Sequence, residues 1–258
     1  MRAAAVSLLL LAPCLWAQSG IAPPQLGFVE DSALALRPAY GVTGNFILGP
    51  AMAANIESAA FSGSLGLLKS ASSLAAFSAQ GKLLASTDVA GGPALFAFSP
   101  TAGAALAYIP SNDSLIAWRG GAFVALASPR LSGDSVLAIG FPSASEATLI
   151  VQSRADELRE VHLPLGAVGS ASENALVGVR APLIMLPAGD LVFADAQGIV
   201  LRRAGASDVH IPAALPARFS LQQMNQDWVE LSDLAGPARF AIHTTAGRAG
   251  FYRLPESK

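Results

Sequence analysis

Short apolar runs separated by turn residues recur along this chain at a nearly constant spacing. The clearest markers are five apolar residues, each near the start of what reads as the second strand of a unit: Leu67, Leu106, Leu149, Val192 and Val229. Successive markers are about 40 residues apart. Phe28 lies about one further period upstream, in an N-terminal hairpin. Such a period predicts the blades of a β-propeller.

Residues 94–129 show the unit most clearly. They contain four strand-like segments, ALFAFSP, GAALAYIPS, DSLIAWRGG and AFVALASP, separated by Ser-Pro, Ser-Asn-Asp and Gly-Gly. These separators favour tight turns. Four antiparallel strands joined by such turns make one propeller blade.

The same layout fits four other stretches, residues 56–89, 135–164, 180–212 and 218–255, although no fourth strand is evident in 135–164. The hairpin at residues 26–41 has no obvious companion strands. We expect it either to complete a sixth blade or to seal the ring by pairing with the C-terminal end, because closure removes exposed sheet edges. The predicted fold is therefore all-β, a propeller of about six four-stranded antiparallel blades. A β-sandwich or an irregular β-solenoid is the alternative.

Two turns resemble a motif of known propellers. Phe98-Ser99-Pro100 followed by Gly103 is similar to the FSPDG turn of WD-like, NHL-like and YVTN-like β-propellers, and residues 77–82, FSAQGK, are a weaker copy. The two copies are only half a blade apart, so at least one is out of the usual place. The Trp-Asp dipeptide of WD repeats and the Asp boxes of sialidases are missing. The resemblance to secreted bacterial propellers implies the fold and assigns no functional residue.

Residues 1–20, MRAAAVSLLLLAPCLWAQSG, predict a secretory signal peptide. The largely apolar stretch from Ala3 to Trp16 is shorter than the roughly 20 residues that span a bilayer. We expect cleavage between Ala17 and Ala22, a single propeller domain at residues 21–258, and export to the periplasm or the extracellular space. Cys14 is the only cysteine and would leave with the signal, so we expect no disulfide. Pro13 disfavours lipidation of Cys14.

Composition narrows the classes of partner. Hydrophobic residues make up 52% of the chain and charged residues 13%, which favours a packed domain over a disordered one. The net charge is −2 and the charges are dispersed, so we expect no nucleic-acid partner and no anionic lipid surface. No second apolar run is long enough for a transmembrane segment.

The three histidines raise the question of a metal site. His162 and His210 have parallel contexts, VHLP and VHIP, while Arg253 takes the corresponding place in YRLP and His243 lies in another strand. These segments are late, outer strands of their units, where blades diverge. We therefore predict packing or solvent-facing histidines and no metal site.

Motifs for catalysis and cofactor binding are lacking. The chain has no GxSxG elbow, no phosphate-binding loop and no HExxH, and Gly41, Gly44 and Gly49 read as turn glycines. Carboxylates are scattered: the pairs Glu30-Asp31 and Asp156-Glu157, and single residues Asp113, Asp134, Asp190, Asp195, Asp227 and Asp233. Turn and surface roles explain each one separately. We predict no catalytic, cofactor-binding or metal-binding residue.

Two further features are open to a partner-binding interpretation. Residues 154–160, RADELRE, form the densest charge cluster and read as a solvated hairpin or as a polar partner site. Trp118 beside Arg119, and Trp228 beside Asp227, read as blade-to-blade packing or as stacking surfaces for a sugar or peptide.

The leading functional hypothesis is an exported, non-catalytic propeller that binds or scaffolds a protein, peptide or glycan through loops at one face. The alternative is a hydrolase or lyase acting on a sugar or lactone at the channel mouth. A third possibility is a structural module for assembly. The sequence specifies neither the ligand nor the oligomeric state.

Overall fold

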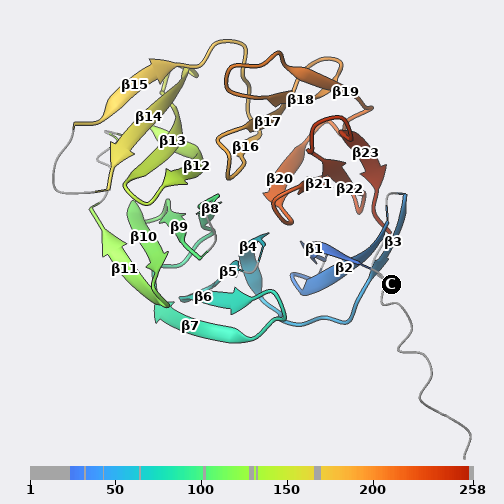
Figure 1. The fold of residues 1–258 in the computed structure, drawn as a ribbon, viewed down its shortest axis with the longest axis horizontal. Helices are drawn as coiled ribbons and strands as arrows, with labels where there is room; N and C mark the ends of the chain where they lie inside the picture. The colour runs from blue at the N-terminus through green and yellow to red at the C-terminus, as the bar shows by residue number, and fades with distance from the viewer. Residues whose placement is uncertain are drawn as a thin grey trace, which may run out of the picture.

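The computed structural model forms a ring of antiparallel sheets around a central channel (Figure 1). It describes residues 24–255 apart from 32, 43, 64, 101–102, 128–130, 132 and 166–169. All regular elements of the described residues are strands, and they form six sheets whose strands follow one another in chain order. The predicted all-β, six-bladed propeller is confirmed.

The blades are numbered here by their order in the chain. Blade 1 contains β1 (Gln25–Glu30), β2 (Leu36–Val42) and β3 (Asn45–Leu48), and blade 2 contains β4 (Ile56–Ser62), β5 (Leu65–Ser70), β6 (Ser73–Ser78) and β7 (Leu83–Asp88). Blade 3 contains β8 (Leu95–Phe98), β9 (Ala105–Ile109), β10 (Ser114–Arg119) and β11 (Ala122–Leu126), and blade 4 contains β12 (Ser135–Ser143), β13 (Glu146–Gln152), β14 (Leu158–Pro164) and β15 (Ser172–Ala175). Blade 5 contains β16 (Leu183–Met185), β17 (Leu191–Ala194), β18 (Gly198–Arg202) and β19 (Val209–Pro212), and blade 6 contains β20 (Phe219–Gln223), β21 (Trp228–Asp233), β22 (Arg239–His243) and β23 (Gly250–Arg253).

The repeat markers occupy equivalent places in the fold. Each of the five lies in the second strand of its blade and has no exposed surface: Leu67, Leu106, Leu149, Val192 and Val229. Second strands are covered on both faces by neighbouring blades, which is why an apolar residue recurs there. The period of about 40 residues therefore reflects the burial of the second strand in each of these blades.

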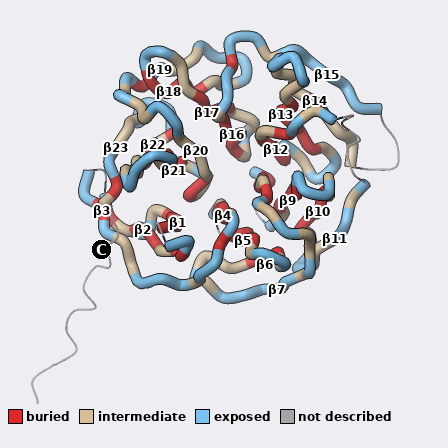
Figure 2. The backbone as a smooth tube through the Cα atoms, turned by 180° about the vertical axis from the view of Figure 1, so that it is seen from behind, coloured by how far each residue is buried: buried red, intermediate tan, exposed pale blue. Residues whose placement is uncertain are grey.

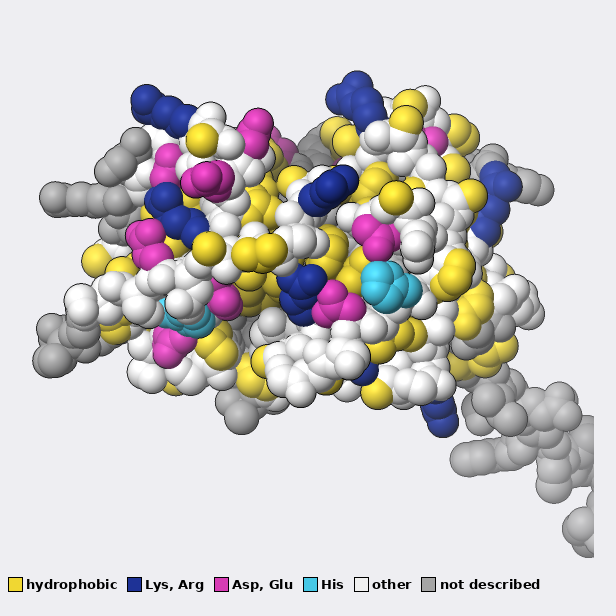
Figure 3. Space-filling view, turned by 90° about the horizontal axis from the view of Figure 1, so that it is seen from above, with side chains coloured by type: hydrophobic (Ala, Val, Ile, Leu, Met, Phe, Trp, Pro, Cys, Tyr) yellow, Lys and Arg dark blue, Asp and Glu magenta, His cyan; other side chains and the backbone are white. Residues whose placement is uncertain are grey.

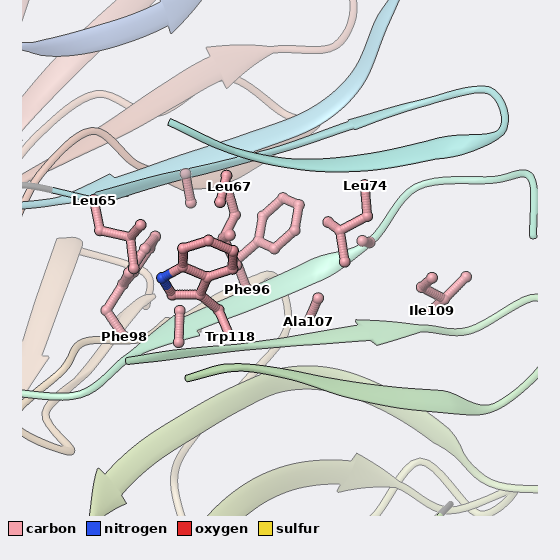
Figure 4. Close-up of a cluster of buried hydrophobic side chains, with 12 residues drawn as sticks. Leu65, Leu67, Leu74, Phe96, Phe98, Ala107, Ile109 and Trp118 are labelled. Carbon is pink, nitrogen blue, oxygen red and sulfur yellow. The ribbon is translucent and has the colours of Figure 1, made fainter. Parts of the chain in front are cut away.

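Stability comes from apolar layers between adjacent blades. Figure 2 shows the buried segments within the ring, with exposed backbone mainly at the rim and turns. Between blades 2 and 3, Leu65, Leu67 and Leu74 meet Phe96, Phe98 and Trp118 (Figure 4). Blade faces that cover each other in this way bury the hydrophobic surface that drives folding.

Blade 1 departs from the predicted four strands. Three strands are described in it, and β1 pairs only with β2. The end of β1, Glu30, lines the same cavity as Glu57 near the start of β4, so β1 runs against the direction of the innermost strands. β1 therefore occupies the position of a second strand in its blade. This agrees with the sequence repeat, in which Phe28 of β1 is the counterpart of the second-strand markers.

The described residues place no strand on the channel side of β1, and β20 lies directly against β4 there (Figure 1). Phe28 stacks on Phe61 of β4 with ring centroids 4.1 Å apart. Gly27 has a φ of 153°, and a Cβ there would lie 2.4 Å from the Met224 carbonyl oxygen of blade 6. In the part of the chain that the structure describes, five innermost strands thus line the channel of a six-bladed ring.

Of the two alternatives predicted for the N-terminal hairpin, the first is confirmed. It belongs to a sixth blade, and among the described strands β23 pairs with β22 and not with the hairpin. The last and first blades instead join through side chains, including Met224 and Trp228 against Val29 and Phe46. Ring closure therefore depends on packing between two separate sheets.

Two strands were not expected. The segment GVTGNFILG contains the end of β2 and the whole of β3, although Gly44 is the predicted turn glycine, with a φ of 82°. The fourth strand of blade 4 is β15. All four of its residues are exposed, so it is held against β14 by backbone hydrogen bonds and not by buried side chains. Neither segment has an apolar alternation long enough to predict a strand.

The two propeller-like turns lie at different places in their blades. Phe98-Ser99-Pro100 begins at the last residue of the first strand of blade 3, whereas residues 77–82 begin at the end of the third strand of blade 2 and lead into the fourth. The predicted signal peptide at residues 1–20, with Cys14, lies outside the described residues. No helix in the described part of the chain is long and apolar enough to cross a membrane.

Candidate functional site

The channel contains a cavity of ≈ 310 Å³ at the end where the innermost strands begin. We call this end the entrance. Ten of the residues that line it have apolar side chains and come from five strands: Ala59, Ala60, Leu95, Phe96, Leu137, Ala138, Ile139, Leu183, Ile184 and Leu221. Several of these side chains, including Phe96 and Ile139, are buried between blades. Among the described residues, the polar side chains that line the cavity come from β1, β4 and β20: Glu30, Glu57, Ser58, Ser220, Gln222 and Gln223. The exposed surface of the cavity is therefore mixed, slightly more polar than apolar, and its polar side chains lie where blades 1, 2 and 6 meet.

Glu57 forms an ion pair with a buried lysine. Lys69 Nζ lies 3.1 Å from Glu57 Oε2, and the Lys69 side chain has no exposed surface whereas Glu57 is 32% exposed. Lys69 Nζ also donates to the carbonyl oxygens of Ser70 and Ala71. The ammonium is thus held by three acceptors at the end of β5. Glu57 is neutralised from within the protein.

Glu30 has a different environment. Among the described residues, the structure gives its carboxylate neither a hydrogen bond nor an ion pair. Burial raises the pKa of Glu30; the positive charge of Arg239 opposes this shift, and the negative charge of Asp31 adds to it. Glu30 is therefore a half-buried carboxylate in the cavity with no described partner at contact distance.

A third carboxylate, Glu230, is buried next to this polar corner. Glu230 of β21 lies directly across from Gln222 of β20, so both side chains are on the sheet face that meets blade 1. Glu230 Oε1 accepts from Arg239 Nη1 at 3.0 Å and from Ser232 Oγ at 2.9 Å. Glu230 Oε2 and Gln222 Nε2 are buried and have no hydrogen-bond partner within the described ranges.

Burial raises the pKa of Glu230 to about 7; Arg239 and Ser232 oppose the shift, and Glu30 adds to it. Glu30 and Glu230 thus share one nearby cation, Arg239. An aromatic layer at the same blade junction, with Trp228 5.9 Å from both Phe46 and Tyr252, helps to keep this polar group away from solvent.

The other member of the predicted pair, Asp31, has a structural role. It accepts from the backbone N–H groups of Ala33 and Ala35 and forms a 2.5 Å ion pair with Arg37. Burial would raise the pKa of Asp31, but these hydrogen bonds outweigh that effect and lower it. Asp31 therefore fixes the turn that positions Glu30.

A second depression, of ≈ 410 Å³, lies at the opposite end of the channel, and we call it the exit depression. Its charged groups are held in local contacts. Arg203 Nε lies 3.2 Å from Asp190 Oδ2, and Arg203 Nη2 donates to the Thr244 carbonyl oxygen. Asp227 Oδ1 accepts from Thr245 Oγ1 at 3.0 Å. Asp190 and Asp227, both predicted as turn or surface residues, serve here to organise loops.

The histidines lie on third and fourth strands, as predicted. His162 pairs with Glu146 at 2.9 Å, His210 with Asp195 at 3.2 Å, and His243 Nδ1 lies 2.8 Å from the Arg248 carbonyl oxygen. Their expected equivalence is wrong: His162 is in a third strand and His210 in a fourth, because the similar VHLP and VHIP segments belong to different strands. Figure 3 shows histidines beside acidic side chains at the outer surface, with charges of both signs dispersed around them.

The remaining candidates are explained locally. Residues 154–160 form the turn before β14 and its first strand residues, where Arg159 pairs with Asp134 at 2.5 Å and with Glu173 at 3.2 Å. Trp118 and Trp228 are 4% and 6% exposed, so they pack between blades and offer no stacking surface. In the described ranges, no group of three or more His, Cys, Asp or Glu side chains could hold a metal ion.

Only Glu30 among the cavity's charged residues was singled out from the sequence. Glu57, Lys69, Gln222 and Glu230 were missed. One usable signal was present: residues following the repeat markers are Leu68, Ala107, Ile150 and Phe193, but Glu230 in blade 6. A carboxylate where the other blades bury an apolar side chain indicates a special environment.

Comparison of the sequence with protein-family models and with curated proteins finds no match. Solved structures do resemble it. A chain in a crystal structure of a nidogen/laminin complex has a TM-score of 0.57 and 11% identity, over 90% of this chain and 98% of that one. The β-propeller domain of Myceliophteria thermophila Cps50 (Swd1) has a TM-score of 0.48 and 13% identity, over 94% of this chain and 89% of that one. The first likeness supports the conclusion that this chain has a β-propeller fold.

Proposed function

We propose that this chain is an exported, non-catalytic β-propeller that binds a protein, peptide or glycan at the channel entrance. The observation that carries the proposal is the entrance cavity, which combines polar and apolar surface and has its charged side chains at one corner. Ligand sites are typically concave, with apolar surface that contributes affinity and polar groups that fix the orientation of the ligand.

The distribution of reactive groups also favours binding over catalysis. The histidines lie on outer strands with local partners, and Glu57 is held by Lys69. General acid–base work needs a group within hydrogen-bond reach of the reacting atoms. The two cavity carboxylates, Glu30 and Glu57, are the observation that keeps a hydrolase or lyase as the second candidate.

The test separates binding from turnover. The purified protein is applied to peptide and glycan arrays, and each ligand it retains is then incubated with the protein in solution and analysed by mass spectrometry. We expect saturable binding and unchanged ligand. Cleavage or elimination products that disappear in Glu30→Gln would favour the enzyme instead.

Export is tested separately, because it depends on residues 1–20. We expect the protein recovered from its source cells to lie outside the cytoplasm and to begin between Ala17 and Ala22. N-terminal sequencing of the purified protein checks this. An intact Met1 on cytoplasmic protein would contradict the proposed export.

A further inference from the structure

We propose that the outer edge of blade 4 binds an extended, basic segment of a partner protein, which adds to the sheet as a fifth strand beside β15. This edge lies on the outer rim of the ring, away from the channel (Figure 1). The inference therefore goes beyond the proposed function. Three observations carry it: a strand with no role in the core, free backbone groups along its edge, and the charge of the surface beside it.

β15 differs from the outermost strands of the other blades. Each of those contributes at least one side chain to an apolar layer between blades: Phe46 from β3, Ala85 from β7, Phe123 from β11, Ile211 from β19 and Phe251 from β23. In the described part of the chain, the four residues of β15 are all exposed and contribute none. Burial of side chains therefore does not explain why this segment is a strand.

The outer edge of β15 presents backbone groups without partners. Leu176 N–H donates to the Leu158 carbonyl oxygen at 2.9 Å, so the backbone groups of Asn174, two residues earlier, also face β14. Backbone groups of successive strand residues point to opposite sides, so those of Glu173 and Ala175 face outward. Within the described ranges, these N–H and C=O groups have no hydrogen-bond partner. Such an edge can pair with an extended segment of another chain.

Two contacts directly after β15 hold this edge in place. Leu176 packs against the apolar layer between blades 4 and 5. The Val177 carbonyl oxygen accepts from Arg202 Nη1 at 2.8 Å. An edge that is already ordered loses less conformational entropy when a partner pairs with it.

The surface beside the edge determines the charge of the partner. A depression of ≈ 510 Å³ lies there, and its lining contains one guanidinium group, Arg159, and three carboxylates: Asp156, Glu157 and Glu173. Arg159 is already held by Asp134 at 2.5 Å and by Glu173 at 3.2 Å. Arg154, on the same turn, lies against Gly133. The depression therefore has excess negative charge and favours a cationic side chain.

Strand pairing also determines which positions of the partner matter. A residue directly opposite Glu173 shares a sheet face with it, and opposite charges in such a pair are stabilising. The residue two places along lies opposite Ala175, whose small side chain leaves room for a β-branched apolar one. We therefore expect a segment in which Lys or Arg is separated by one residue from Val or Ile.

The test uses a defined peptide and NMR. Acetyl-Thr-Val-Thr-Lys-Thr-Val-Thr-amide, which can place Val opposite Ala175 in either strand direction, is titrated into ¹⁵N-labelled protein. We expect saturable shift changes at Glu173 and Ala175, and about threefold to tenfold weaker binding when glutamate replaces the lysine. No binding, equal affinity for the two peptides, or shift changes confined to other surfaces would overturn the proposal. The proposed function would stand in each case, because it concerns the entrance cavity.

Variants locate the contact. Ala175→Pro removes an outward-facing donor and no hydrogen bond to β14, so it should weaken binding about fivefold to tenfold without unfolding the blade. Ser86→Pro on β7 is the matched control and should leave the affinity unchanged. Ser86 is exposed, and its N–H also faces outward, because Val89 N–H, three residues on, donates to the Ser72 carbonyl oxygen.

A charge exchange tests the proposal even if Ala175→Pro folds poorly. Glu173→Lys should bind the glutamate peptide more tightly than the lysine peptide. Unchanged affinity in Ala175→Pro, or an unchanged preference in Glu173→Lys, would contradict the proposal. Analytical ultracentrifugation without peptide covers the remaining occupant: a dimer that is lost in Ala175→Pro would assign the edge to a second copy of this chain and overturn the proposal.

Discussion

Glu230 shows how much one residue can differ from its repeat equivalents. The corresponding positions in the other four-stranded blades are Leu68, Ala107, Ile150 and Phe193, all buried. Glu230 is equally buried, so its carboxylate depends on Arg239 and Ser232 for compensation. Replacing an apolar residue by a carboxylate at such a site costs stability, which proteins commonly accept at functional positions.

The first prediction concerns pH. The pKa of Glu230 is about 7 in the folded state against an ordinary value of 4.5, so folding favours the protonated carboxyl. Its contribution to stability is therefore fully present below pH 4.5 and is lost as the pH rises through 7, a change on the order of 3 kcal/mol. Urea unfolding from pH 4.5 to 8 should show the wild type losing stability more steeply than Glu230→Gln. Glu30, whose pKa is also raised, should leave a smaller slope of the same sign in the variant.

That comparison has a matched control. Glu157→Gln should follow the wild-type pH dependence, because Glu157 is exposed. Parallel curves for the wild type and Glu230→Gln would contradict the buried, shared environment assigned to Glu230.

The second prediction concerns the pair of Lys69 and Glu57. Glu57→Gln leaves a fully buried ammonium with carbonyl acceptors only and should lower the free energy of unfolding by about 3 kcal/mol. Lys69→Met removes the buried charge, keeps the length of the side chain and leaves Glu57 partly hydrated, so we expect a loss within about 1 kcal/mol. Urea unfolding midpoints of both variants measure the difference. A larger loss in Lys69→Met than in Glu57→Gln would contradict this assignment.

At the scale of strands, the sequence predicts those strands whose side chains are buried. The second strands were found because neighbouring blades cover both of their faces, and their marker residues are fully buried. β15 was missed because its four exposed residues carry no apolar pattern, and β3 because it is short and lies between glycines. A strand that is held by backbone pairing alone has no apolar alternation from which it could be predicted.

The candidate site was less predictable than the fold. Lys69 and Glu57 face each other across β4 and β5, and Glu30 comes from another blade, so their meeting depends on register and ring closure. A single polar residue in a strand does not reveal whether it faces the channel, a neighbouring blade or solvent. Glu30 was noticed only as one of two adjacent carboxylates.

The third prediction tests the contact that seals blade 1 against blade 6. Gly27→Ala would place a Cβ 2.4 Å from the Met224 carbonyl oxygen at a φ of 153°, so both backbones must shift. We expect a loss of about 2–4 kcal/mol in the free energy of unfolding. Gly44→Ala is the control: its φ is 82° but a Cβ there meets nothing within 4 Å, so it should cost only about 1 kcal/mol. Thermal or urea unfolding measures both, and equal losses would contradict the tight approach of β1 to the Met224 backbone.

For the whole molecule, the ring closes without a strand shared between blades 6 and 1, and this determines which residues surround the candidate site. Side-chain packing joins blades 6 and 1, while β20 and β4 meet at the channel in front of β1. This arrangement places Glu30, Glu57 and Gln222, from three different blades, around one cavity. The irregular blade thus contributes Glu30 to a polar corner whose other side chains come from blades 2 and 6.

The location of binding tests this account most directly. Ser220→Arg places a long cation in the entrance cavity, and Gln226→Arg makes the same change in the exit depression. The measurement is the affinity of the wild type and of both variants for a peptide or glycan retained on the arrays. We predict that Ser220→Arg abolishes binding and that Gln226→Arg preserves it. Binding that survives Ser220→Arg and is lost in Gln226→Arg would contradict the entrance as the functional site.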